Sequence, residues 1–383
     1  MIFLRAIPSI KKNSAGKDFL EVHVDSDVGK LRVSVPVGTS RSAFEYPFLL
    51  GREIRKIQRL STKCRGMEFR NVNDVLKFEK RCKCLPISLA IIKGLSLERH
   101  LPVWKLLFKK ARPPLIISKI FGGGKHTSLL GAPEFQEFLV FPTSDVGLQK
   151  NIFLNKLVYK RALKFLKREK ITFTTDIEGG IVAKLTNEQV LNLLANIVQS
   201  VSYESETELA IGIDVAASSF FIRGRYKYLD RRIDEDSQLK YIKFLTEEYN
   251  LRYVEDPFHQ NAFDSFRKFK RYFRRKVIIC GDDLVATRLK RLRVANSHHA
   301  INACIIKPNQ CYSLSETLAV MKLAKKFKYL RVFSHRSVET PERIFADLAM
   351  GCEMYKISVV TRERMLKLRR LIEILNENGV VSS

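Results

Sequence analysis

Apolar and polar residues alternate over residues 19–37, FLEVHVDSDVGKLRVSVPV, with an acidic residue and a glycine at a turn near the middle. A period of two around such a turn predicts a β-hairpin. Apolar residues recur with helical spacing over about 43–60 and 86–110, which predicts helices there. Residues 1–115 are therefore interpreted as a separate α+β N-terminal domain that caps the rest of the chain.

The pattern changes after about residue 115. Short β-prone runs recur along the chain: EFLVFP, ITFTTDI, ELAIGIDV, LRYVED, KVIICGDD, NACIIKP, LRVFSH and MYKISV. Amphipathic basic segments of helical length separate most of them, and strands that alternate with helices indicate a parallel sheet. Eight such strands predict a TIM-like (β/α)8 barrel over residues 116–383 that contains the active site, with atypical first connections.

Ionisable residues stand where these predicted strands end. In chain order they are Glu178, Asp214, Glu255, Asp282, Lys307, His335 and Lys356, and successive members are 21 to 41 residues apart. This spacing is about one strand-helix unit. Because the chemistry of such barrels lies at the carboxyl ends of the strands, we expect these side chains to share one mouth of the barrel.

Three of these residues, Asp214, Glu255 and Asp282, are acids on adjacent predicted strands. Carboxylates a few ångströms apart repel one another unless a cation lies between them, and an all-oxygen ligand set is the preference of Mg²⁺. The alternative interpretation is that each acid is a separate helix cap or salt-bridge partner. Lys307 ends the next apolar run, where burial and a nearby divalent cation would both lower its pKa, as an amine base requires. Lys356 is similarly placed, and two lysines beside a metal indicate an anionic substrate.

Composition limits the class of protein. The longest nearly apolar run, from Leu85, is broken by Pro86 and Lys93 and is too short to span a bilayer, and no signal peptide is recognisable. Seven cysteines are scattered without disulfide or zinc spacing, which indicates a cytoplasmic protein. The net charge is +28. The basic residues mostly follow helical spacing, which favours a solvated outer helix layer; non-specific contact with nucleic acid or steering of an anionic substrate is the alternative.

The order of several short motifs resembles enolase over nearly the whole chain. GIDVAAS at 212–218, YVEDPF at 253–258, GDDL at 281–284 and IIKPNQ at 305–310 are similar to the family's metal-ligand and base motifs. SHRS at 334–337, VPVGTS at 35–40 and GGGKH at 122–126 are similar to its SHRSGET, mobile-loop and GGSHAG motifs. The resemblance implies an archaeal-type, divergent member.

The resemblance implies reversible dehydration of 2-phosphoglycerate to phosphoenolpyruvate. Four residues would bind two Mg²⁺ ions, the second of which arrives with the substrate: Asp214, Glu255, Asp282 and Ser40. Lys307 would remove the C2 proton of 2-phosphoglycerate, and Glu178 would protonate the departing C3 hydroxyl. Glu137 would support the acid side of the site, and His126 would close over the substrate.

The remaining implied roles concern the substrate. Residues that would contact or line it are Gln136, His335, Arg336, Ser337 and Lys356. Arg336 and Ser337 would bind the phosphate, and Lys356 would bind the carboxylate of this phosphorylated hydroxy acid. The resemblance also implies a homo-oligomer, either a dimer or a higher assembly.

Some residues depart from the family pattern. Val338 replaces the glycine of SHRSGET, and a β-branched residue would be strained there if the position required positive φ. Arg41 and Ser219 also differ from the usual residues. Two other functions therefore stay open: a non-catalytic paralogue that binds RNA or another acidic partner through its basic surface, and a dehydratase that acts on a phosphate-free acid.

Overall fold

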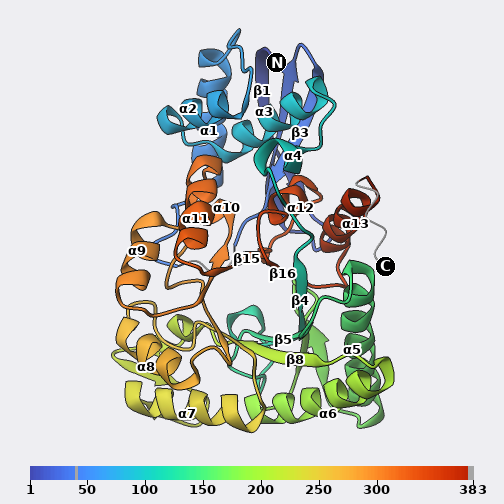
Figure 1. Cartoon of the computed structure of the whole chain (residues 1–383), viewed down its shortest axis with the longest axis vertical. Helices are drawn as coiled ribbons and strands as arrows, with labels where there is room; N and C mark the ends of the chain where they lie inside the picture. The colour runs from blue at the N-terminus through green and yellow to red at the C-terminus, as the bar shows by residue number, and fades with distance from the viewer. Residues whose placement is uncertain (39–41, 378–383) are drawn as a thin grey trace.

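The computed structural model describes residues 1–38 and 42–377. An antiparallel sheet of β1 (Phe3–Lys12), β2 (Asp18–Ser26) and β3 (Gly29–Val35) opens the chain, in that spatial order. The pairing of β2 with β3 confirms the predicted hairpin, whereas the pattern missed β1. Figure 1 shows this sheet and its helices above the barrel.

Four helices follow the N-terminal sheet: α1 (Leu50–Lys63), α2 (Val72–Arg81), α3 (Leu85–Glu98) and α4 (Val103–Leu107). Helices α1 and α3 pack on the sheet, whereas α2 and α4 pack on α3. The predicted helix over 86–110 is two helices, because His100 adopts a φ of 50° and Pro102 follows it. Helix α1 begins later than predicted, at Leu50. Helix α3 is buried along most of its length, which accounts for its apolar sequence.

Eight strands close the barrel: β4 (Leu115–Gly122), β5 (Glu137–Pro142), β8 (Leu209–Asp214), β12 (Tyr253–Glu255), β13 (Ile278–Gly281), β14 (Ala303–Ile306), β15 (Leu330–Ser334) and β16 (Met354–Lys356). Strand β16 pairs with β4 to complete the ring. Strand β5 runs antiparallel to both β4 and β8, and the other barrel pairs are parallel. This architecture confirms the predicted fold class, including its atypical first connections.

One predicted barrel strand is wrong. ITFTTDI forms β6 (Phe173–Thr175), which pairs with β7 (Ile181–Ala183) in a hairpin beside β4, outside the ring. The missing barrel strand is β4, whose residues after Leu115 are all buried. A strand buried on both faces has no polar alternation, so the pattern did not reveal it.

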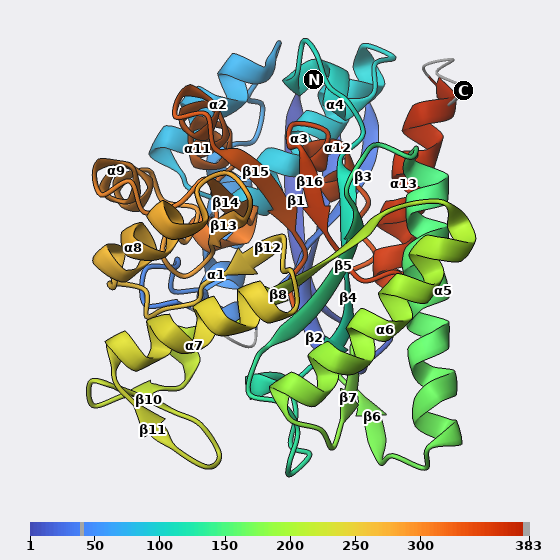
Figure 2. The same ribbon diagram turned by 60° about the horizontal axis from the view of Figure 1, so that its bottom comes forward.

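Helices form the outer layer of the barrel: α5 (Leu148–Arg168), α6 (Asn187–Ser205), α7 (Glu235–Glu248), α8 (Phe263–Phe273), α9 (Leu289–Ser297), α10 (Pro308–Cys311), α11 (Leu314–Lys326), α12 (Ile344–Ala349) and α13 (Arg362–Glu377). Short strands β9 (Phe221–Ile222), β10 (Arg225–Lys227) and β11 (Arg232–Ile233) and two 3-10 turns, η1 (Gly124–His126) and η2 (Ala217–Ser219), lie in the connections. Figure 2 shows α5 and α6 side by side on the outside. No helix in the described part of the chain has both the length and the apolar character needed to cross a bilayer.

The barrel interior is a separate apolar cluster. Its members come from all eight barrel strands: Ile117, Leu139, Phe141, Ala210, Tyr253, Cys280, Ala303, Ile305, Val332 and Met354. Cys280 on β13 and Cys304 on β14 are fully buried small residues. This packed interior holds the carboxyl ends of the strands in fixed positions, and the ionisable residues stand there.

Candidate active site

Most of the predicted site residues line a single pocket at the carboxyl ends of the barrel strands. Those that line it are Gln136, Glu137, Glu178, Asp214, Asp282, Lys307, His335, Arg336 and Ser337. Glu255 and Lys356 are buried and contact this group through ion pairs. Ser40 lies outside the described residues, and so does the side chain of His126.

Lys356 is the centre of a buried ion cluster. Its Nζ lies 2.9 Å from Asp214 Oδ2, 2.8 Å from Glu255 Oε1 and 3.3 Å from Glu137 Oε2. The three acids stand at matching positions, since Glu137 and Glu255 are the register partners of Asp214 on the two neighbouring strands. The oxygens of Asp214 and Glu255 therefore lie no farther apart than two hydrogen-bond lengths.

Burial controls the protonation of this cluster. Burial and the negative charge of Asp214 raise the pKa of Glu255 to about 8, although Lys356 opposes the shift. Burial also raises the pKa of Glu137. Burial by itself would lower the pKa of Lys356, but the surrounding carboxylates outweigh it and hold that pKa well above its usual value. These carboxylates are therefore stable in the ionised form only when positive charge lies beside them.

Lys307 and Asp282 form a second ion pair at the pocket wall. Lys307 Nζ lies 2.5 Å from Asp282 Oδ2, and Gln310 Nε2 donates to Asp282 Oδ1 at 2.7 Å. Burial favours a lower pKa for Lys307, but the contact with Asp282 outweighs it and the pKa is raised. The lowered pKa expected from the sequence presupposes a divalent cation beside Lys307 and stays a prediction.

The donor set fits a hard divalent cation. Asp214 and Glu255 both contact the ammonium group of Lys356, and the negative charge of Asp282 acts on Glu255. The carboxylate of Asp256 accepts hydrogen bonds from the backbone N–H groups of Asp282 and Asp283, which fixes the loop that carries Asp282. Oxygen-only ligands on rigid strand ends are what Mg²⁺ requires.

Lys119 forms ion pairs with two acids at the side of the pocket where Glu178 lies. Its Nζ lies 2.7 Å from Asp176 Oδ2 and 2.6 Å from Glu178 Oε2, and all three side chains are buried. A Cβ on Gly122 would lie 2.2 Å from Asp176 Oδ2, so glycine makes room for the carboxylate. Lys119 and Asp176 were not predicted from the sequence; the available signal was a lysine inside the apolar run LIISKIFG.

His335 is neutral and presents one nitrogen to the acids. Arg364 Nε donates to His335 Nδ1 at 2.6 Å, so the proton of the neutral ring is on Nε2. Burial, and then the charge of Arg364, lower the pKa of His335 well below its usual value. Within the described part of the chain Nε2 is buried without a hydrogen-bond partner, and ligand atoms of His335, Glu137 and Glu178 lie within 4.8 Å of one another. Nε2–H is thus available to a ligand.

Arg336 pairs with an acid from the N-terminal domain. Its two terminal nitrogens lie 2.8 and 3.1 Å from the carboxylate oxygens of Glu45, and both side chains are nearly fully buried. The approach is close, because a Cβ on Gly38 would lie 1.8 Å from Arg336 Nη2. Glu339 Oε1 accepts from the backbone N–H of Arg336 at 3.0 Å. Glu45 was not predicted from the sequence.

Val338 joins the two domains beside this arginine. Its N–H donates to Val37 O at 2.9 Å, and Val37 N–H donates to Val338 O at 3.1 Å, which forms an antiparallel β-bridge. Val338 is not among the residues with positive φ. The strain considered from the sequence is therefore absent at this position, since an extended backbone suits a β-branched residue.

Comparison with known proteins finds relatives that match most of the chain. The family described as enolase, C-terminal TIM barrel domain, matches residues 112–382. The chain is 30% identical to enolase from Pyrobaculum aerophilum, over 93% of this chain and 90% of that relative. It is 36% identical to enolase from Methanocorpusculum labreanum, over 75% of this chain and 73% of the relative, and 34% identical to enolase from Archaeoglobus fulgidus, over 75% and 72%.

Proposed function

Because the chain belongs to the enolase family, we propose that it catalyses the Mg²⁺-dependent, reversible dehydration of 2-phosphoglycerate to phosphoenolpyruvate. The observation that carries the proposal is that Lys307 and Glu178 line one pocket together with the acidic strand ends. A base and an acid on one substrate are what the elimination of a proton and a hydroxyl group requires.

Asp214, Glu255 and Asp282 would hold the tightly bound Mg²⁺, and Ser40 would help to hold a second one that arrives with the substrate. The metal would stabilise the second negative charge that develops on the substrate carboxylate when the adjacent proton leaves. The fit of the donor set described above supports this part of the proposal. The family's use of a lysine base with Mg²⁺ is a known pattern.

Lys307 removes the proton from C2 of the substrate. It must be neutral to do so, and its contact with Asp282 holds it charged. If Asp282 held the metal, its carboxylate would be shared between the cation and Lys307, and the positive charge of the cation would act together with burial to lower the pKa of Lys307. Metal binding at Asp282 and activation of Lys307 would therefore be coupled.

Glu178 protonates the departing C3 hydroxyl on the other side of the pocket. Lys119 fixes the Glu178 carboxylate, and the Nε2–H of His335 is available to the leaving oxygen. Gln136 lines the same pocket, and its backbone N–H donates to Asp214 O at 3.0 Å. Glu137 supports this side through Lys356, and His126 would close over the substrate.

Arg336 and Ser337 bind the phosphate group, for which the planar guanidinium is suited. In this structure the guanidinium of Arg336 donates to both carboxylate oxygens of Glu45. The phosphate must therefore displace Glu45 or share the guanidinium with it. Lys356 binds the substrate carboxylate. Because Lys356 already contacts three acids, the substrate carboxylate reaches it only when the charge on those acids is neutralised.

The test is the rise in ultraviolet absorbance of the enol product when purified protein, Mg²⁺ and 2-phosphoglycerate are mixed. Lys307→Ala and Glu178→Gln are each expected to lower kcat by about 10²–10⁴-fold. Soluble, metal-loaded wild-type protein without turnover would overturn the proposal. Turnover of phosphate-free hydroxy acids in preference to 2-phosphoglycerate would move the assignment to another dehydratase.

The family also supports a cytoplasmic homo-oligomer, which is part of the same proposal. Light scattering of the purified protein tests it directly. A strictly monomeric mass at working concentration would contradict this part without affecting the catalytic assignment.

A further inference from the structure

A groove opens where the segment between the two domains meets the barrel. Its walls come from α4 and the residues that lead to β4, from α11, and from the segments at the start of β15 and β16. These segments lie at the amino ends of the strands, whereas the candidate active site lies at the carboxyl ends (Figure 1). The groove has a volume of about 1110 Å³ and is separate from the catalytic pocket.

Unpaired positive charge lines this groove. Five of its lining side chains are cations that form no ion pair or side-chain hydrogen bond within the described part of the chain: Lys109, Lys110, Arg112, Lys322 and Lys325. Arg331 also lines the groove, but its charge is compensated by Glu353, which is the acid among the lining residues. Arg331 Nε donates to Glu353 Oε2 at 3.1 Å. The groove therefore has an uncompensated positive field.

The groove also contains an aromatic surface. Phe108 is partly exposed, and Trp104 and Met321 lie beside it in the lining. One edge of the Phe108 ring packs against Gly351, because a Cβ on Gly351 would lie 2.5 Å from Phe108 Cζ and 2.5 Å from Met321 Cε. A fixed ring among unpaired cations offers stacking and phosphate neutralisation in one place.

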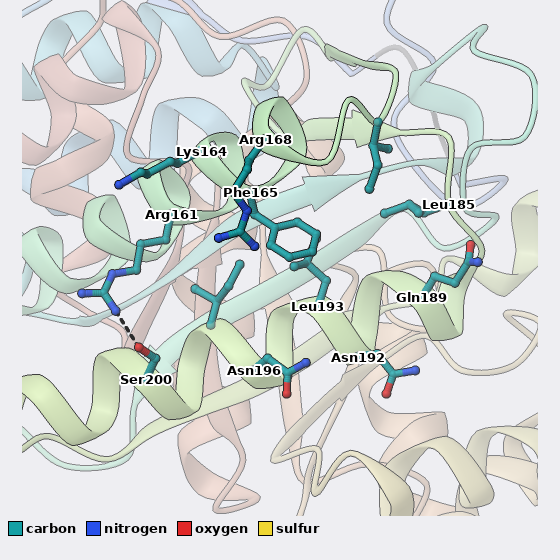
Figure 3. A pocket seen from close by; sticks show the side chains of 12 residues that line it. Arg161, Lys164, Phe165, Arg168, Leu185, Gln189, Asn192, Leu193, Asn196 and Ser200 are labelled. Carbon is teal, nitrogen blue, oxygen red and sulfur yellow. Dashed lines mark hydrogen bonds between the residues drawn. The ribbon is translucent and has the colours of Figure 1, made fainter.

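A second groove, between α5 and α6, is a useful contrast (Figure 3). It has a volume of about 640 Å³ and also has basic residues over an apolar floor. Two of its three cations are compensated there: Arg161 Nη1 donates to Glu204 at 2.8 Å and to Ser200 at 2.8 Å, and Arg168 Nε donates to Glu169 at 2.8 Å. The two grooves differ in unpaired charge and not merely in basic composition.

We propose that the groove lined by Lys109, Lys110, Arg112, Lys322 and Lys325 binds single-stranded nucleic acid. The phosphates lie against these cations, and a base stacks on Phe108. A peptide segment made of Asp and Glu alone would satisfy the cations but has no flat ring system to stack on Phe108. This surface lies outside the catalytic pocket, so the proposal does not depend on the dehydration reaction.

The experiment measures fluorescence anisotropy of a labelled oligouridylate of about twelve nucleotides, within the size range of such sites, over a series of salt concentrations. The triple variant Lys109→Gln, Lys110→Gln, Arg112→Gln is expected to bind at least about tenfold more weakly. Its slope of log affinity against log salt is expected to be shallower by about 2, because each phosphate contact to a single strand contributes about 0.7.

The matched control removes the same charge from the groove of Figure 3, as Arg161→Gln, Lys164→Gln, Arg168→Gln. It is expected to retain nearly the wild-type affinity and slope. Phe108→Leu keeps an apolar side chain and is expected to lower affinity about fivefold without a change in slope, because base stacking does not depend on salt. Circular dichroism melting of each variant establishes that it is folded.

Three results would overturn the proposal. The first is equal loss of binding in the two triple variants, which would mean attraction by overall charge alone. The second is competition by polyglutamate that equals competition by unlabelled RNA, which would assign the groove to an acidic protein segment. The third is absence of binding by wild-type protein at about 0.15 M salt.

Discussion

The ammonium group of Lys119 lies 2.6 Å from the carboxylate of Glu178, and Asp176 contacts the same ammonium group at 2.7 Å. The three side chains expose at most 4% of their surface. A buried cation between two acids keeps both of them close together at the acid side of the pocket. Without Lys119, two carboxylates would face each other away from water.

Lys119→Met is therefore expected to destabilise the protein by about 3–5 kcal/mol, since it leaves buried acids without their partner. Chemical denaturation followed by circular dichroism measures this change. The double variant Lys119→Met, Asp176→Asn removes one acid as well and is expected to be more stable than the single variant. A double variant that is less stable than Lys119→Met would show that the ion pair is not what stabilises this region.

His335 is expected to make stability depend on pH. Its pKa is well below the value of about 6.5 that it has in the unfolded chain. Below about pH 6.5 the unfolded state binds a proton that the folded state does not, so His335 lowers stability by about 1.4 kcal/mol per pH unit until its folded pKa is reached.

The check is the difference between wild type and His335→Gln in unfolding free energy from about pH 7 to 5. Subtracting the variant isolates the contribution of His335, because Glu255 changes the stability in the opposite direction. The pKa of Glu255 is raised to about 8, so its contribution to stability is lost as pH rises toward that value. The wild type is expected to lose stability relative to the variant as pH falls. Parallel curves for the two proteins would mean that His335 titrates normally in the folded state.

The Glu45–Arg336 ion pair is expected to compete with phosphate. Glu45→Gln removes the negative charge but keeps the side chain length, so Arg336 is freer to accept an external anion. Inorganic phosphate is expected to bind about tenfold more tightly to this variant, a change of about 1.4 kcal/mol, by calorimetry. Arg336→Met is the control and should abolish the gain. Weaker phosphate binding by Glu45→Gln would instead mean that Glu45 orients the arginine.

The sequence revealed the residues at the strand ends but not the partners that hold them. Asp214, Glu255 and Lys356 could be predicted because each follows an apolar run, and they do meet. Lys119 and Asp176 come from segments 57 residues apart and meet only in three dimensions, as do Glu45 and Arg336. Strand β4 was missed for a related reason: burial on both faces removes the alternation that marks a strand.

Replacing Val338 with glycine tests whether the backbone at this position needs the conformational freedom of the glycine in SHRSGET. Because Val338 is 6% exposed and bridges to Val37 with extended backbone, Val338→Gly is expected to cost about 2–3 kcal/mol, from lost apolar burial and greater freedom of the unfolded chain. Urea unfolding measures the change. A glycine variant that is as stable as wild type or more stable would mean that the valine is strained in solution.

Metal binding should stabilise the folded protein through the acidic strand ends. Asp214 and Glu255 are buried side by side, and Lys356 alone cannot neutralise both of them and Glu137. Mg²⁺ at about one hundred times its dissociation constant is expected to add about 2.7 kcal/mol to the unfolding free energy, and chelation with EDTA should reverse the gain.

Glu255→Gln should lose most of the gain, because its neutral amide is a weaker ligand for a hard cation. The exposed Asp264, replaced by Asn, is the matched control and should keep the gain. If Glu255→Gln responded to Mg²⁺ as strongly as Asp264→Asn, the ion would be bound elsewhere, and the three strand-end acids would be partners of Lys356 and Lys307 alone.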